Sequence, residues 1–140
     1  MRPVPFLPAL LGLISLLPFL YAAAALSGAI TPPQAYWASP YSVFNSYGAI
    51  YLGFWGGVYW GFAAKRANIL DVLIAIVPPF AAFGASVSPS PTLSYAIGIA
   101  AMLVFDLIYI SRGIAPKWWL PLRIYTGSVA IACLVYAYYA

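Results

Sequence analysis

The stretch VLIAIVPPFAAFGASVSPSPTLSYAIGIAAMLVF, residues 72–105, contains no charged side chain. It consists of two apolar runs on either side of Val87-Ser88-Pro89-Ser90-Pro91. Alternating serine and proline interrupt a helix and favour a turn. With its flanking residues each run is about 20 residues long, and a helix of that length spans about 30 Å of bilayer hydrocarbon. The stretch therefore predicts a hairpin of two membrane-spanning helices.

The rest of the chain repeats this pattern of long uncharged runs. No charge occurs between Arg2 and Lys65, and none follows Arg123. Of the 140 residues 65% are hydrophobic and 6% are charged, whereas a soluble domain carries about 25% charged residues. We therefore predict an all-α, polytopic transmembrane bundle that forms a single domain over residues 1–140. Its five spans are expected at about residues 5–26, 41–64, 68–86, 92–111 and 118–139.

The basic residues predict how this bundle is oriented. Arg2 precedes the first span, Lys65 and Arg66 separate the second from the third, and Arg112 and Lys117 separate the fourth from the fifth. Lysine and arginine are enriched in cytoplasmic loops. We therefore expect the N-terminus in the cytoplasm and the C-terminus outside. No transit segment rich in Arg and Ser precedes the first span, which favours the bacterial inner membrane over the mitochondrial one.

The second span carries a stripe of small residues at a spacing of four, which places them on one helix face. A face of this kind lets another backbone approach closely. The stripe of Ala49, Gly53, Gly57 and Gly61, widened by Gly56, predicts helix packing within the bundle or with a partner.

A second interpretation of the same region is a pocket for a flat hydrophobic ligand. Aromatic side chains beside the stripe could form its walls, and the two prolines inside the third span free helix carbonyls that need a partner. The candidate lining residues are Asn45, Trp55, Tyr59, Trp60, Pro78 and Pro79. Helix packing is the favoured interpretation because small-residue faces commonly serve helix association in membranes.

Two charged residues inside the spans predict an intramembrane ion pair. Asp106 lies about five residues before the inner end of its span and Arg123 about five residues after the start of the next, roughly 8 Å inside the boundary at 1.5 Å per residue. A short turn joins the two helices, so the side chains should meet. Arg112 could instead reach Asp106 by snorkelling. Asp71, in the first turn of its helix and just after Lys65 and Arg66, is expected to complement the helix dipole and order that loop.

The residue groupings that catalytic and cofactor sites commonly require are missing. The chain has no histidine and one cysteine, Cys133, so a haem ligated by histidine and a His/Cys metal site are excluded. Neither a glycine-rich loop beside a lysine nor a Ser/His/Asp set occurs. We predict no enzymatic activity, no metal, no cofactor held covalently or through histidine, no nucleic acid and no soluble small-molecule substrate. Contacts with lipid, quinone or pigment remain compatible with the composition.

Several motifs resemble the transmembrane protein 69 family of small five-helix membrane proteins. They are the block from Tyr47 to Gly61, the pair Val77-Pro78, Asp106, and the run from Gly113 to Arg123 followed by Thr126. The resemblance covers nearly the whole chain and implies a five-helix fold without implying an activity. It marks as signature positions Gly56, Gly57, Trp60, Gly61, Asp106, Trp118 and Arg123. The chain departs from the pattern at Tyr59, where such proteins commonly have His or Arg.

These observations support two hypotheses about function. In the first, the protein is a non-catalytic accessory, structural or assembly subunit of a larger energy-converting complex of the inner membrane, respiratory or photosynthetic. It would contact lipids and other integral membrane subunits through helix packing. In the second, it binds or carries a hydrophobic ligand such as a lipid, quinone or tetrapyrrole. Proton or ion transport ranks third, because the outer halves of the spans hold no ionisable group of the kind a relay needs.

Overall fold

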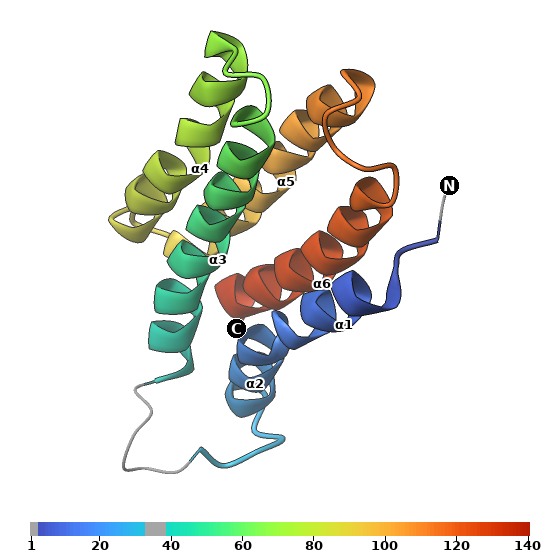
Figure 1. Ribbon diagram of the computed structural model, residues 1–140. Helices are drawn as coiled ribbons and strands as arrows, with labels where there is room; N and C mark the ends of the chain where they lie inside the picture. Colours follow the sequence, from blue (N-terminus) through green and yellow to red (C-terminus); the bar gives the residue numbers. More distant parts are fainter. Residues whose placement is uncertain (1–2, 33–38) are drawn as a thin grey trace.

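Helices account for nearly all of the chain that the computed structural model describes, residues 3–32 and 39–140 (Figure 1). Arg2 lies outside these residues. No strand occurs among them, which confirms the all-helical prediction. The helices are α1 (Phe6–Ile14), α2 (Leu17–Leu26), α3 (Pro40–Ala63), α4 (Ile69–Ser86), α5 (Pro91–Ser111) and α6 (Trp119–Tyr139).

Four segments are long and apolar enough to cross a membrane: α1 and α2 taken together (Phe6–Leu26), α4, α5 and α6. They indicate a multi-pass membrane protein. The predicted second span, α3, has 24 residues but does not meet the same criterion. Its many Gly, Tyr and Ser residues make it less apolar than the other four.

The first predicted span is divided into two helices by a turn at Ser15 and Leu16. Pro18 lies in the first turn of α2. Proline has no N–H to donate, and its ring clashes with the carbonyl of the residue four positions earlier, here Ile14. The hydroxyl of Tyr47 on α3 donates a 2.8 Å hydrogen bond to the carbonyl of Ser15. The break therefore follows from proline chemistry, and a side chain from α3 satisfies one of the carbonyls at the turn.

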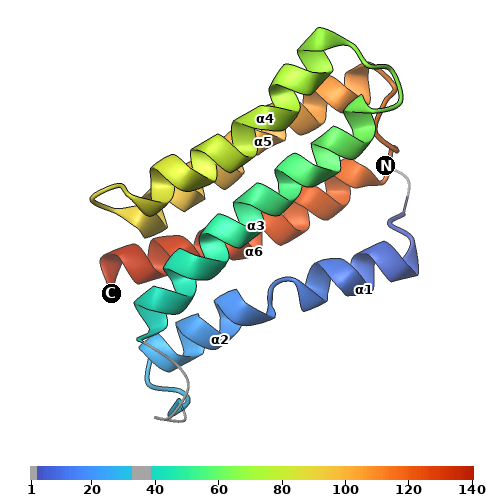
Figure 2. The ribbon, with the colours of Figure 1, turned by 60° about the vertical axis from the view of Figure 1, so that its left-hand side comes forward.

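The helices are arranged in three layers. α3 and α6 lie between the pair α4 and α5 on one side and the pair α1 and α2 on the other (Figure 2). The turn between α3 and α4, the turn between α5 and α6, and the start of α1 share one end of the bundle (Figures 1 and 2). The C-terminus and the turn between α4 and α5 lie at the other end. The two turns that contain basic residues are thus on the same side of the molecule.

Gly56 brings α3 and α4 unusually close together. A Cβ atom built at Gly56 would lie 2.6 Å from Cδ of Pro79 and 3.2 Å from the carbonyl oxygen of Ala75. α4 continues through Pro78 and Pro79, although Pro79 cannot donate to the carbonyl of Ala75. Only glycine leaves room for this contact, so Gly56 fixes the distance between the two helices.

Candidate functional site

A buried ion pair connects α5 to α6 in the core of the bundle. Nε of Arg123 donates a 2.9 Å hydrogen bond to Oδ2 of Asp106, and both side chains are 0% exposed. The other carboxylate oxygen, Oδ1, accepts hydrogen bonds from the hydroxyl of Tyr59 at 2.8 Å and from Nε1 of Trp119 at 2.7 Å. Residues of α3 and α6 thus donate hydrogen bonds to one carboxylate, which belongs to Asp106 of α5. We call Tyr59, Asp106, Trp119 and Arg123 the polar node.

The positions of the node residues follow from helix geometry. Trp119 and Arg123 are four residues apart in the first turns of α6, so they lie on the same face. Asp106 lies in the last turns of α5, directly across the short connection to α6. Tyr59 reaches the node from α3 and its hydroxyl also lies 3.0 Å from the carbonyl of Met102.

An aromatic ring covers the guanidinium group of Arg123. Its Cζ atom lies 3.8 Å from the ring centroid of Trp55, which is the geometry of a cation–π interaction. The ring of Trp55 is in turn perpendicular to that of Trp119, with 5.3 Å between centroids. The arginine is therefore held by the carboxylate of Asp106 and by an indole ring.

A second ion pair lies nearer the end of the bundle that carries the basic turns. Arg112 donates to Oδ1 of Asp71, and the hydroxyl of Tyr109 donates to the carbonyl of Asp71 at 2.9 Å. Asp71 is fully buried, whereas the side chain of Arg112 is 28% exposed. Arg112 therefore contacts Asp71 and leaves Asp106 to Arg123. Asp71 joins α4 to α5, while Asn68 caps α4 by accepting a 2.9 Å hydrogen bond from the backbone N–H of Leu70.

A family model described as "Protein of unknown function (DUF3429)" matches residues 4–139. The chain belongs to the DUF3429 family. No curated protein and no solved structure matches it. The match includes the whole polar node. It does not carry the name of the transmembrane protein 69 family, so that resemblance stays a prediction.

The structure of this DUF3429 protein does not bring the six predicted pocket residues together. Trp55 and Tyr59 are buried side by side in the core, but Trp60 is 53% exposed on another face of α3. Pro78 and Pro79 contact Gly56. The remaining residue, Asn45, lies farther towards the start of α3, where its Oδ1 accepts a 3.0 Å hydrogen bond from the hydroxyl of Tyr95. Neighbouring residues of a helix point in different directions, which separates Trp60 from Tyr59.

The small residues of α3 fall on two faces. Gly48 and Gly56 point into the bundle, where a Cβ atom would come within 2.6 Å of Tyr95 and of Pro79 respectively. A Cβ atom at Gly53, Gly57 or Gly61 would meet nothing within 4 Å. The glycine part of the stripe is thus directed away from the other helices, whereas Ala49 is partly buried against the core, and packing within the bundle also uses Gly48 and Gly56.

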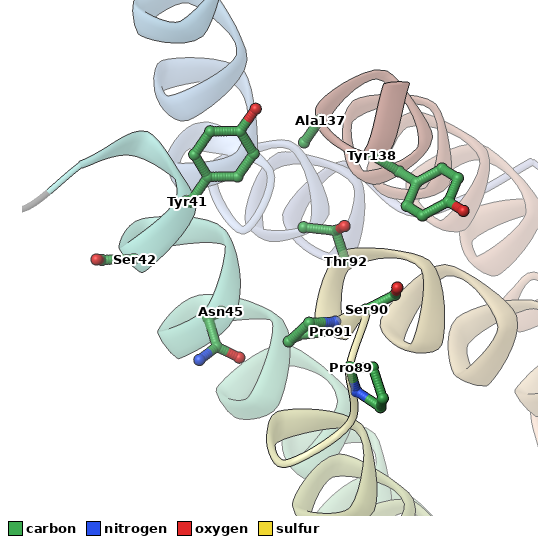
Figure 3. Close-up of a pocket in the computed structure, with 9 residues that line it drawn as sticks. All are labelled: Tyr41, Ser42, Asn45, Pro89, Ser90, Pro91, Thr92, Ala137 and Tyr138. Atoms are coloured by element: carbon green, nitrogen blue, oxygen red, sulfur yellow. The ribbon is translucent and has the colours of Figure 1, made fainter. Parts of the chain in front are cut away.

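A cavity of about 430 Å³ opens at the end of the molecule opposite the basic turns (Figure 3). The starts of α3 and α5 and the end of α6 surround it. Hydroxyl groups, prolines, one amide and one alanine form its lining: Tyr41, Ser42, Asn45, Pro89, Ser90, Pro91, Thr92, Ala137 and Tyr138. Of these residues the sequence pointed only to Asn45 as part of a pocket.

The polar node joins α3, α5 and α6 through hydrogen bonds to one carboxylate. Both oxygens of Asp106 accept hydrogen bonds from donors on α3 and α6. Among the described residues no three His, Cys, Asp or Glu side chains are grouped to hold a metal ion. Sequence reasoning missed Trp119 as a partner of Asp106. Its spacing of four from Arg123 was the signal that could have revealed it.

Proposed function

We propose that this DUF3429 protein is a non-catalytic accessory subunit that binds a transmembrane helix of a larger membrane complex through the outer face of α3. The observation that carries the proposal is the open space around Gly53, Gly57 and Gly61, where a Cβ atom would meet no neighbour within 4 Å. We call these three glycines the α3 stripe.

The open space matters because glycine has no other evident purpose at these positions. A glycine in a helix costs about 1 kcal/mol relative to alanine in water. At Gly48 and Gly56 this cost is offset by close contacts inside the bundle. At the α3 stripe the fold itself gains nothing, whereas a partner helix could approach the bare backbone closely.

The side chains beside the α3 stripe fit the same proposal. Phe54 is 61% exposed and Trp60 is 53% exposed, and both are large and apolar. Large side chains on either side of a small-residue groove would surround a helix placed in it. With short connections and few charges, such a protein meets its partners inside the bilayer.

We further propose that α3 crosses the membrane, giving five spans with the N-terminus in the cytoplasm of a bacterial cell. α3 lies alongside the four apolar segments and equals or exceeds them in length. The turn between α3 and α4, which contains Lys65 and Arg66, lies at the same end of the bundle as the turn between α5 and α6, which contains Arg112 and Lys117 (Figure 2). A shared basic end facing the cytoplasm agrees with the distribution of basic residues in membrane proteins.

The test compares two glycine substitutions that are open to the outside. Gly57→Leu adds a large side chain to the α3 stripe, and Gly84→Leu adds the same side chain to α4, where a Cβ atom also meets nothing within 4 Å. Each variant would be extracted from native membranes in mild detergent, and particle size, protein content and absorption spectrum read on one fraction. We expect wild type and Gly84→Leu in a large assembly and Gly57→Leu in a small particle. An assembly that keeps Gly57→Leu would contradict the proposal.

A further inference from the structure

Three buried side chains near the polar node hold hydrogen-bond donors that no residue of the described part of the chain accepts. They are both Nη atoms of Arg123, Nε1 of Trp55 and the hydroxyl of Tyr51. The three residues are 0%, 6% and 2% exposed. We call them the donor cluster.

The three side chains are neighbours. Cζ of Arg123 lies 3.8 Å from the ring centroid of Trp55, and the ring of Trp55 lies 5.6 Å from that of Tyr51. The large majority of buried polar side-chain atoms in proteins have a hydrogen-bond partner, since an unmade bond in a medium of low dielectric constant is costly. Several unpaired donors in one place therefore indicate an acceptor that the protein itself does not supply.

From this arrangement we infer that the donor cluster binds the carbonyl oxygen of a neutral, membrane-soluble molecule. Asp106 already balances the charge of Arg123 through its 2.9 Å contact with Nε. A neutral acceptor would complete the hydrogen bonds without adding charge, whereas an anion would leave a net negative charge in an apolar interior. The ring carbonyl of a quinone and the ester carbonyl of a lipid share this chemistry.

A groove between α1 and α6 offers space for the apolar part of such a molecule. It has a volume of about 240 Å³ and is lined by Val4, Ala9, Leu13, Pro121, Leu122 and Tyr125. α1 contains no buried residue. Its Gly12 lies against Leu122 and Thr126, the residues of α6 on either side of Arg123. The groove is therefore bounded by α1 and by the helix that carries Arg123.

The first test titrates purified protein in a neutral detergent with decylubiquinone and follows tryptophan fluorescence, which a bound quinone quenches. The parent protein carries Trp60→Phe, which removes an exposed indole that a quinone could reach from the micelle. We expect saturable quenching. Tyr51→Phe should weaken binding about fivefold because one hydrogen bond is lost, and Arg123→Gln at least tenfold because charged hydrogen bonds are lost. Tyr136→Phe, the same change at a 43% exposed tyrosine, should leave the affinity unchanged.

Tyr51→Phe keeps the test decisive even if Arg123→Gln does not fold. The hydroxyl of Tyr51 makes no hydrogen bond within the described chain, so its removal should leave the thermal unfolding temperature equal or higher. Absence of saturable quenching in the parent, or identical affinities of the parent and Tyr51→Phe, would overturn the inference and leave internal water as the partner of the donors.

Competition distinguishes the sources of the acceptor. Displacement of decylubiquinone by methyl decanoate would support the inference with an ester carbonyl as a second source, and failure to displace it would support a quinone ring. Stronger displacement by decanoate than by its methyl ester at pH 8 would overturn the inference, because the cluster would then prefer an anion.

Discussion

The two ion pairs of this protein contain the same chemical groups but lie in different surroundings. Asp106 of α5 binds Arg123 of α6, and Arg112, the residue directly after α5, binds Asp71 of α4. Arg123 is completely buried beneath the ring of Trp55, while Arg112 is 28% exposed at the end of the bundle. The difference indicates that the pair Asp106–Arg123, at the polar node, holds three helices in one arrangement. The pair Asp71–Arg112 is partly solvated and connects α4 to the end of α5.

The reason lies in the dielectric surroundings of each charge. In the interior no water can take the place of a missing partner. Removing one member of a buried pair therefore costs far more unfolding free energy than removing both. At the membrane edge water and ions can solvate an abandoned charge. Substitutions should therefore separate the two pairs clearly, and unfolding by sodium dodecyl sulfate in mixed micelles can measure the difference.

The largest effect is expected from Arg123→Leu. It leaves the carboxylate of Asp106 buried without its cation, which should cost about 3–5 kcal/mol of unfolding free energy. The double variant Asp106→Leu with Arg123→Leu should be more stable than Arg123→Leu alone, because it removes the orphaned charge. If the double variant lost as much unfolding free energy as the two single variants together, the pair would act through shape and packing. That result would weaken the comparison.

The next effect is expected from Tyr59→Phe. It removes the 2.8 Å hydrogen bond to Oδ1 of Asp106 while keeping the ring, and hydrogen bonds to charged groups contribute about 1.5–3 kcal/mol. The unfolding free energy should fall by that amount. Tyr138→Phe, the same change at a 43% exposed residue of α6, is the control and should have no effect.

A smaller effect is expected from Arg112→Gln. Its loss leaves the fully buried Asp71 without a cation, but Arg112 is partly exposed, so water can enter the space that it vacates and take over some of its role. The cost should be about 1–2 kcal/mol, between the values of an exposed and a fully buried pair. A cost as large as that of Arg123→Leu would remove the distinction between the two pairs.

The smallest effect is expected from salt. Raising sodium chloride to about 1 M shortens the screening length to about 3 Å, which should reduce the stabilisation by Arg112 by a few tenths of a kcal/mol. The stabilisation by Arg123 should not change, because that residue is fully buried. The measurement is the unfolding free energy of wild type and of each arginine variant at low and high salt. Equal salt dependence of the two variants would contradict the assigned difference in exposure.

Much of the fold could be predicted because burial in a membrane depends on local composition. The uncharged run from Val72 to Phe105, interrupted by serine and proline, predicted two helices with a break, and α4 and α5 follow it closely. The depth of Asp106 and Arg123 within their spans also followed from counting residues, which is why their proximity could be expected. Helix rise is constant, so position along the axis is readable from the chain.

The direction in which each side chain points around its helix axis could not be predicted in the same way. In a membrane the core and the surrounding lipid are both apolar, so hydrophobicity does not show which face turns inward. For this reason Gly53 and Gly57 were grouped with Gly56, although only Gly56 packs against α4. Trp60 was likewise grouped with Trp55, although their side chains lie on different faces.

The sequence by itself thus determined that the chain is helical, that it has several segments able to cross a membrane, and at what depth its few charges lie. These properties depend on composition and on the fixed rise of a helix. The tertiary structure decided that Arg112 pairs with Asp71, that Trp119 and Tyr59 donate to Asp106, and that the α3 stripe is left uncovered. These contacts depend on the rotation of each helix about its axis, which is set by the packing of all the helices together.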